Sequence, residues 1–340
     1  GASAGSMRPT LWPAPAKLNL MLHITGRRAD GYHLLQTVFQ FLDYGDALTI
    51  EVTRDGAIEL ANPIEGVPDA QNLLYRAALL LRKQTGSTLG ARITIDKRLP
   101  MGGGLGGGSS DAATVLVALN HLWGTKLGED QLAALGLQLG ADVPVFVRGQ
   151  ACWAEGVGER ITPVTLPEPC YLVVVPPVQI STAALFRDDD LTRDCPPIKI
   201  AAFVAGGGRN VFVPVVRKLY PQVAEMMDLL SAYGDVKLTG TGACLFLAFD
   251  HCDQARAVQQ QLPDYMVPAA LMRLDDFPRL PNGKVDRGAL RALELAPEAA
   301  PAAPASSRWR RPGATPRRSA GSAGRAAWPR AGGWARPLPP

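Results

Sequence analysis

Apolar residues recur along the chain at two spacings, and each spacing predicts a different element. Alternation of apolar and polar positions, or a short β-branched run, predicts strands at 15–22, 37–44, 47–52, 91–96 and 171–175. Apolar residues three and four positions apart predict helices at 72–83, 130–139, 223–233 and 253–261. The strands at 37–44 and 47–52 are expected to be separate and joined near Gly45. The interleaved elements indicate a mixed α/β domain in the first half of the chain.

A glycine-rich segment interrupts this pattern at residues 98–111. Six glycines surround the single Leu105, so the backbone amides are free to curve around an anion and approach it closely. The strand predicted at 91–96 precedes the segment, and a helical pattern with Val115 and Leu119 follows it. Ser109 is expected to cap that helix. The segment would therefore deliver a phosphate group to a helix N-terminus, where free amides and the positive end of the dipole favour negative charge.

Other kinds of glycine loop fit this segment less well. A Walker A loop requires a lysine after its last glycine, and here Ser109 follows Gly108. Gly102, Gly104 and Gly107 meet the dinucleotide-binding spacing, but any polyglycine run does so, and no strand-ending acid follows at the distance that a ribose would require. A flexible linker is not framed by a strand and a helix. The residues alone indicate a phosphate-binding loop and no more.

Composition sets the broad class of the protein. A chain of 340 residues with 47% hydrophobic residues can bury a substantial core, and we expect two domains. No apolar run approaches the roughly 20 residues of a membrane span, and no signal-peptide pattern opens the sequence. The five cysteines show no metal-ligand spacing, so reduced thiols in a cytoplasmic enzyme are expected.

The net charge of +4 arises from one end of the chain. Residues 297–340 contain eight arginines and one acid, so residues 1–296 carry a net charge of −3. A mildly acidic body gives no support to a nucleic-acid-binding surface. The tail is rich in Ala, Pro, Gly and Ser, and we expect it to be disordered.

Three short segments carry candidate chemistry, and each has an ordinary alternative. Lys17 and Asn19 share one face of the first predicted strand, where Lys17 could equally be a solvated charge. Tyr32 and His33 end a glycine-punctuated turn and could be an ordinary edge aromatic and loop histidine. Asp142 stands where a helix stops and, because Pro144 follows, an extended run is expected to begin; there it could act in capping or in catalysis.

Three motifs in order resemble one enzyme superfamily. Residues 100–114 resemble the ATP loop of the galactokinase, homoserine kinase, mevalonate kinase and phosphomevalonate kinase (GHMP) superfamily, residues 139–144 its aspartate motif, and residues 237–246 its third motif. Within the superfamily, the match is to the 4-diphosphocytidyl-2-C-methyl-D-erythritol kinases of the non-mevalonate isoprenoid pathway. The resemblance implies an α+β fold with an N-terminal ribosomal-S5-like α/β domain and a C-terminal ferredoxin-like α+β domain.

The resemblance also implies roles for individual residues. Lys17 and Asp142 would be catalytic. Asn19, Tyr32, His33, Thr239 and Gly240 would bind the substrate, and residues 179–185 match a further, weakly marked substrate segment. ATP would be bound by Pro100, Met101, Gly102, Gly103, Gly104, Leu105, Gly106, Gly107, Gly108, Ser109 and Ser110.

The implied reaction is the ATP-dependent phosphorylation of the 2-hydroxyl of 4-diphosphocytidyl-2-C-methyl-D-erythritol. ATP would be the co-substrate and Mg²⁺ would accompany it, while no dedicated metal cluster is visible in the sequence. Asp111 could reach that ion through water or compensate charge at the helix N-terminus. The expected partner is this small molecule, with no nucleic acid and no membrane, for a monomer or homodimer.

The predicted organisation has five parts. Residues 1–6 are expected to be a leader or a vector-derived scar, 7–160 the N-terminal ATP-binding domain, 161–261 the C-terminal domain, and 297–340 the disordered tail. Residues 262–296 resemble the C-terminal end of peptide-synthetase adenylation domains, as a fused reading frame or a real appendage would. An alternating segment near 269–274 could replace the edge strand that the family has at this point.

Three alternatives remain at this level. The chain could be another kinase of the superfamily, acting on homoserine, mevalonate or a sugar. It could be a chimera that binds nucleotide without catalysis, or an adenylation fragment that serves as an interaction module.

Overall fold

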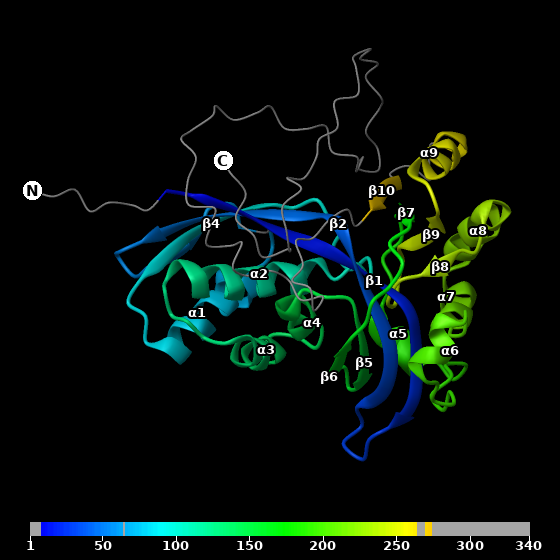
Figure 1. Ribbon diagram of the computed structural model, residues 1–340, viewed down its shortest axis with the longest axis horizontal. Coiled ribbons are helices and arrows are strands. Elements are labelled where there is room, and N and C mark those ends of the chain that lie inside the picture. Colours follow the sequence, from blue (N-terminus) through cyan, green and yellow to red (C-terminus); the bar gives the residue numbers. More distant parts are fainter. Residues whose placement is uncertain (1–7, 64, 264–268, 274–340) are drawn as a thin grey trace, which may run out of the picture.

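Two β-sheets organise the protein in a computed structural model that describes residues 8–63, 65–263 and 269–273. One sheet has six strands and the other four, and helices lie against each of them (Figure 1). The predictions for residues 1–6 and 297–340, and that for 262–296 apart from residues 262, 263 and 269–273, lie outside the described residues.

The first sheet is built on a long antiparallel hairpin of β1 (Thr10–Arg27) and β2 (His33–Thr53). Strand β2 also pairs with β4 (Gly90–Asp96) and β5 (Cys152–Gly156). Strand β3 (Ile58–Leu60) lies parallel to β4, and β6 (Arg160–Pro163) pairs with β5. In β4 the side chains alternate between buried and exposed, as the apolar spacing of the sequence predicted.

The separate strands expected at 37–44 and 47–52 are one continuous strand, so the turn predicted near Gly45 is wrong. Gly45 pairs with Pro15 across the hairpin, and a Cβ on it would lie 2.1 Å from the backbone oxygen of Ala14. The pairing shifts register between Pro15 and Lys17. Glycine is required here because two backbones approach closely at an irregularity in the sheet.

Four helices gather on one side of this sheet (Figure 1). They are α1 (Leu73–Thr85), α2 (Gly107–Leu122), α3 (Glu129–Leu137) and α4 (Val143–Arg148), and a 3₁₀ turn at Asp69–Gln71 precedes α1. Helix α2 is apolar almost all round, with Val115, Leu116 and Leu119 fully buried, so it forms the centre of this half.

Two local predictions in this half are wrong. Ser109 lies inside the first turn of α2, and Gly106 occupies the cap position with φ 72°. Residues 143–148 form a helix in place of the expected extended run, with Asp142 at its cap position and Pro144 in its first turn. Proline is tolerated there because the amide that it lacks would have no partner within the helix.

The second sheet has the order β10-β7-β9-β8. Its strands are β7 (Cys170–Val174), β8 (Lys237–Leu238), β9 (Leu245–Phe249) and β10 (Ala269–Arg273). Around it lie α5 (Thr182–Arg187), α6 (Ile200–Val204), α7 (Val213–Leu219), α8 (Pro221–Leu230) and α9 (Cys252–Gln261), with a 3₁₀ turn at Ser231–Tyr233. Across the part of the chain that the structure describes, no helix is both long and apolar enough to cross a membrane.

The expected edge strand near 269–274 is confirmed, whereas the expectation that all cysteines are reduced is wrong. Strand β10 pairs antiparallel with β7 from Ala269 opposite Val174 to Arg273 opposite Cys170, so the segment near 269–274 does supply an edge strand. Cys170 and Cys252 form a disulfide with a Cα–Cα distance of 5.2 Å, which corrects the expectation that all five cysteines are reduced. Their separation of 82 residues gave no sign of this pairing in the sequence.

Apolar side chains from both halves meet around the glycine loop. Leu105 at the tip of the loop is fully buried among Leu18 of β1, Leu42 of β2, and Tyr171 and Phe246 of the second sheet. The loop is therefore anchored where the two sheets face each other, which fixes its position relative to both.

Candidate active site

A cavity of about 890 Å³ lies between the glycine loop, the β1–β2 hairpin, helix α5 and the turn at residues 240–241. Both predicted catalytic residues, Lys17 and Asp142, line it. The other predicted residues that line it are Asn19, Tyr32, His33, Pro100, Gly102, Gly103, Gly104, Gly106, Gly107, Ser109 and Gly240. Lys17 and Asp142, which are 125 positions apart in the sequence, thus line the same cavity.

The backbone of the loop is fixed by contacts with β1 and with the turn at residues 239–244. The amide of Lys17 donates to the carbonyl of Leu105 at 2.9 Å, and the amide of Cys244 donates to the carbonyl of Gly103 at 3.0 Å. Gly104 has φ 84°, and a Cβ on it would lie 2.2 Å from the carbonyl oxygen of Thr239. These contacts hold the loop in one curved shape at the N-terminus of α2, as an anion-binding loop requires.

Four residues predicted to bind ATP do not line the cavity. Leu105 and Ser110 are fully buried, and Met101 is 56% exposed. Gly108 is exposed in the first turn of α2. The apolar Leu105 anchors the loop, so its contribution is to the shape of the site.

Lys17 lines the cavity and is buried. Only 3% of the surface of Lys17 is exposed. Its Nζ donates to Oδ1 of Asn19 and lies 5.6 Å from the centre of the Phe39 ring. Burial lowers the pKa of Lys17, and the negative charge of Asp142 opposes that shift. The charges of Lys17 and Asp142 therefore interact in the cavity, and a bound anion would further favour the charged form of Lys17.

Asn19 belongs to a chain of hydrogen bonds that ends on the glycine loop. Its Nδ2 donates to Oγ1 of Thr37 at 2.9 Å, and its backbone amide donates to Oγ1 of Thr239 at 3.0 Å. Oγ1 of Thr239 donates in turn to the carbonyl of Gly104 at 3.0 Å. Thr239 is fully buried and does not line the cavity, so the predicted substrate contact of Thr239 is replaced by a link between β1 and the loop.

The far end of the cavity is aromatic. Tyr32 is 65% exposed at the tip of the β1–β2 hairpin, and the ring of His33 lies 4.9 Å from that of Phe186. Burial, together with the charges of Arg27 and Arg193, lowers the pKa of His33, which favours the neutral ring. Flat rings beside a neutral imidazole suit a planar, hydrogen-bonding base.

Sequence reasoning missed two residues that shape the site. Phe186 follows directly on the weakly marked segment 179–185 and lines the cavity from α5. Asn210 lies outside the cavity, but its Nδ2 donates to the carbonyls of Leu238 and Gly240, at 2.9 Å each, and holds the turn that contacts the glycine loop. An aromatic residue in a short helix and an asparagine in a loop carry no signal of such roles in one sequence.

Asp111 does not reach the cavity. Its Oδ2 lies 3.0 Å from Nζ of Lys97, which also lies 2.7 Å from Oδ2 of the buried Asp46. Burial and the neighbouring negative charge of Asp46 raise the pKa of Asp111 well above its ordinary value. Asp111 therefore belongs to a buried charge cluster that ties α2 to the first sheet, which replaces the predicted contact with a metal ion.

Two protein-family models match parts of the chain that line this cavity. Residues 72–150 match the family model of the GHMP kinases N terminal domain, and residues 197–268 match that of the GHMP kinases C terminal domain. The first match contains the glycine loop and Asp142, and the second contains the turn at 239–242.

Relatives match along most of the chain. The 4-diphosphocytidyl-2-C-methyl-D-erythritol kinase of Ectopseudomonas mendocina (strain ymp) is 62% identical over 251 residues, which are 74% of this chain and 86% of the relative. The kinase of the same name from Nitrosococcus oceani is 59% identical over 255 residues, covering 75% of this chain and 91% of the relative.

A solved structure agrees with these sequence matches. The crystal structure of a 4-(cytidine 5'-diphospho)-2C-methyl-D-erythritol kinase superposes with a TM-score of 0.68 at 33% identity, covering 77% of this chain and 98% of that one. Fold, motif order and sequence identity over most of the relatives' length lead to the same conclusion. The chain belongs to the 4-diphosphocytidyl-2-C-methyl-D-erythritol kinase family of the GHMP kinases.

Proposed function

We propose that the protein transfers the γ-phosphoryl group of ATP to the 2-hydroxyl of 4-diphosphocytidyl-2-C-methyl-D-erythritol, a step of isoprenoid precursor synthesis. One observation carries the proposal: a single cavity is lined by the anchored glycine loop, by Lys17 and by Asp142, and it ends among aromatic rings. Phosphoryl transfer asks an enzyme chiefly to position the two substrates and to stabilise spread charge. A preformed loop, together with the opposite charges of Lys17 and Asp142 in the same cavity, meets both demands.

In this proposal, Asp142 is the general base. The substrate hydroxyl oxygen attacks the γ-phosphorus, the bond from that phosphorus to the bridging oxygen of ADP breaks, and the hydroxyl proton passes to the Asp142 carboxylate. Lys17 offsets negative charge on the transferred group. Asn19 holds the Lys17 ammonium in place through Oδ1.

The glycine loop would hold the triphosphate. Gly102, Gly104 and Gly106 have φ of 70°, 84° and 72°, a backbone shape that turns successive amides toward one concave side. Ser109 adds a hydroxyl beside them at the start of α2. The amides and the helix dipole supply the positive potential that the phosphates require.

Mg²⁺ would enter with the nucleotide. Among the described residues, no group of three or more His, Cys, Asp or Glu side chains could hold a metal ion. Mg²⁺ commonly uses one or two protein oxygens and the phosphates of its substrate, and Asp142 and Ser109 offer such oxygens in the cavity. Its contribution there would be to neutralise phosphate charge.

The cytidine end would lie among Tyr32, His33 and Phe186. The aromatic faces can stack on a pyrimidine, and the neutral imidazole can donate to one base atom. This placement leaves the erythritol end of the substrate near Lys17 and Asp142. The proposal needs no nucleic acid, membrane or partner chain, and it holds for a monomer or a homodimer.

A coupled assay of ADP release tests the proposal. The wild type should consume ATP with 4-diphosphocytidyl-2-C-methyl-D-erythritol and not with homoserine, mevalonate or galactose. Asp142→Asn and Lys17→Met should each lower kcat at least about 100-fold while the unfolding transition stays cooperative. Turnover of one of the other alcohols at a comparable rate, or near-normal activity of either variant, would contradict it.

A further inference from the structure

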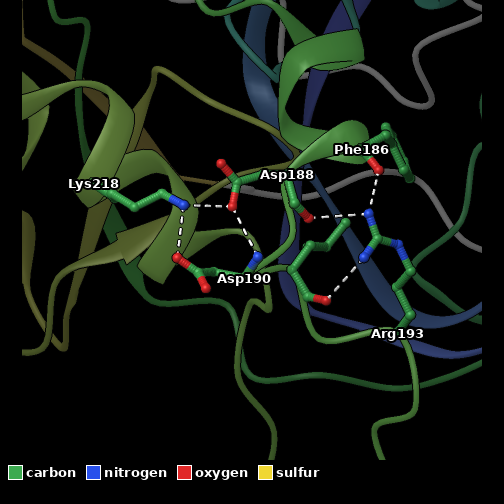
Figure 2. Close-up of polar contacts among 6 residues, drawn as sticks. Phe186, Asp188, Asp190, Arg193 and Lys218 are labelled. Carbon is green, nitrogen blue, oxygen red and sulfur yellow. Dashed lines mark hydrogen bonds and ion pairs between the residues drawn. The ribbon is translucent and has the colours of Figure 1, made fainter.

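An arginine outside the cavity holds the end of the helix that carries Phe186. Nη2 of Arg193 donates to the carbonyls of Phe186 at 2.5 Å and Asp188 at 3.1 Å, and Nη1 donates to that of Leu191 at 3.4 Å (Figure 2). The carbonyls at the C-terminal end of a helix have no partners within it and favour a cation. Arg193 thus supplies donors to the C-terminal end of α5 and links that end to the loop at residues 188–193.

A second cation fixes the same loop from α7. Nζ of Lys218 lies 2.6 Å from Oδ1 of Asp188 and 2.6 Å from Oδ2 of Asp190, and the amide of Asp190 donates to Oδ1 of Asp188 at 2.9 Å (Figure 2). Exposed ion pairs contribute little to stability when isolated. Here several share one short segment, so together they restrict the positions that it can take.

The ring that these contacts position faces the aromatic end of the cavity. Phe186 lies 4.9 Å from His33 and meets Phe212 edge-on at 5.1 Å. Helix α5 has only six residues, which is too short to be stable without outside contacts. At its other end, Ser181 caps it and Thr182 Oγ1 lies 2.9 Å from Thr241 Oγ1. Arg193 is the corresponding restraint at the Phe186 end.

We propose that Arg193 is a positioning residue for recognition of the nucleobase: it sets the Phe186 ring against His33 through the backbone of α5. The inference rests on the proposed function, because it names the cytosine base as the group that this ring contacts. Arg193 itself does not line the cavity. Its loss should therefore weaken binding of the cytidine end and leave the ATP end unaffected.

The test measures the Kd of cytidine 5′-diphosphate and of a non-hydrolysable ATP analogue by calorimetry, with KM values from the coupled assay beside them. Arg193→Ala should raise Kd for cytidine 5′-diphosphate about three- to tenfold, the range expected for losing one well-placed aromatic contact. Kd for the ATP analogue should change less than about twofold. Arg193→Lys keeps the charge but not the planar fork, so its Kd should fall between those of wild type and Arg193→Ala.

A double-mutant cycle separates positioning from general weakening of the fold. If Arg193 acts through Phe186, Arg193→Ala should add less than about twofold to Kd in the Phe186→Ala background. Arg217 provides a control, because it too donates to a carbonyl of a helix, that of Ala224 at 3.4 Å; unlike Arg193 it also pairs with a carboxylate, that of Asp228 at 2.8 Å. Arg217→Ala should leave both Kd values unchanged.

Three results would overturn the inference. They are an unchanged Kd for cytidine 5′-diphosphate in Arg193→Ala, equal weakening for both ligands, or full multiplication of the two single effects in the double variant. If Arg193→Ala does not fold, the same comparisons apply to Arg193→Lys. A wild type that binds cytidine 5′-diphosphate but transfers no phosphate would contradict the proposed function and leave this cycle interpretable.

Discussion

Replacement of Gly104 by alanine tests whether contact between the two glycine-rich turns sets the geometry of the site. The new Cβ would lie 2.2 Å from the carbonyl oxygen and 3.1 Å from the carbonyl carbon of Thr239. Both atoms belong to the backbone, so no side-chain rotation relieves the overlap. The loop must move away from Thr239, and its displacement should approach 1 Å.

The control is Gly124→Ala at the end of α2. Gly124 has φ 66°, close to the 84° of Gly104, but a Cβ there would meet no atom within 4 Å. Both variants therefore carry the same left-handed strain of about 1–2 kcal/mol, and only Gly104→Ala carries the overlap. A misplacement of about 1 Å in a catalytic site can cost 100-fold in rate. We expect kcat/KM for ATP to fall about 100-fold in Gly104→Ala and less than about twofold in Gly124→Ala.

Coupled steady-state kinetics and urea unfolding of the two variants provide the measurement. The free energy of unfolding should fall by about 1–2 kcal/mol in both, with the larger loss in Gly104→Ala. Equal kinetic constants for the two variants would refute the reasoning, because the contact with Thr239 would then have no bearing on the loop.

Four further outcomes are expected. Thr239→Val leaves a buried amide and a buried carbonyl without their hydroxyl partner, so it should lower stability by about 2 kcal/mol and lower kcat/KM about tenfold; an unchanged kcat/KM would contradict the link to the loop. The folded-state pKa of Asp111 is raised, so the contribution of Asp111 to stability is fully present below its unfolded pKa of about 4 and is lost as pH rises from there through the folded-state pKa. The free energy of unfolding of Asp111→Asn minus that of wild type, measured by urea unfolding, should therefore increase from about pH 4 to about pH 8. A difference that does not change with pH would contradict the raised pKa. Titration of the unreduced, denatured chain should find three free thiols because Cys170 and Cys252 are paired, and five would contradict the disulfide. A chain ending at Leu262 should be less stable than one ending at residue 273 by about 2 kcal/mol or more, since it lacks the ladder of β10 on β7; equal unfolding midpoints would remove that strand from the fold.

Local patterns sufficed where a feature depends on neighbours in sequence. The alternation at 91–96 and the periodicity at 72–83 predicted β4 and α1 to within about two residues, because one buried face suffices for each. The glycine loop was predicted from composition, since few other arrangements use six glycines around one leucine. The pairing of Lys17 with Asp142 in one cavity came from the family resemblance, and the placement of both residues agrees with it.

The remaining features depend on contacts between distant segments, which no local pattern records. Gly45 looked like a turn because its reason for being glycine, the backbone of Ala14, is 31 residues away. Thr239 looked like a substrate contact because its partners, Asn19 and Gly104, are brought to it only by the packing of both sheets. Phe186 and its restraint by Arg193 were missed for the same reason.

The most direct test of the central claim is a crystal structure of the protein with a non-hydrolysable ATP analogue and 4-diphosphocytidyl-2-C-methyl-D-erythritol. We expect the triphosphate on the amides of residues 102–109, and the acceptor 2-hydroxyl within about 3 Å of the Asp142 carboxylate and near Nζ of Lys17. A triphosphate bound away from the loop, or an acceptor hydroxyl beyond the reach of both side chains, would contradict the account.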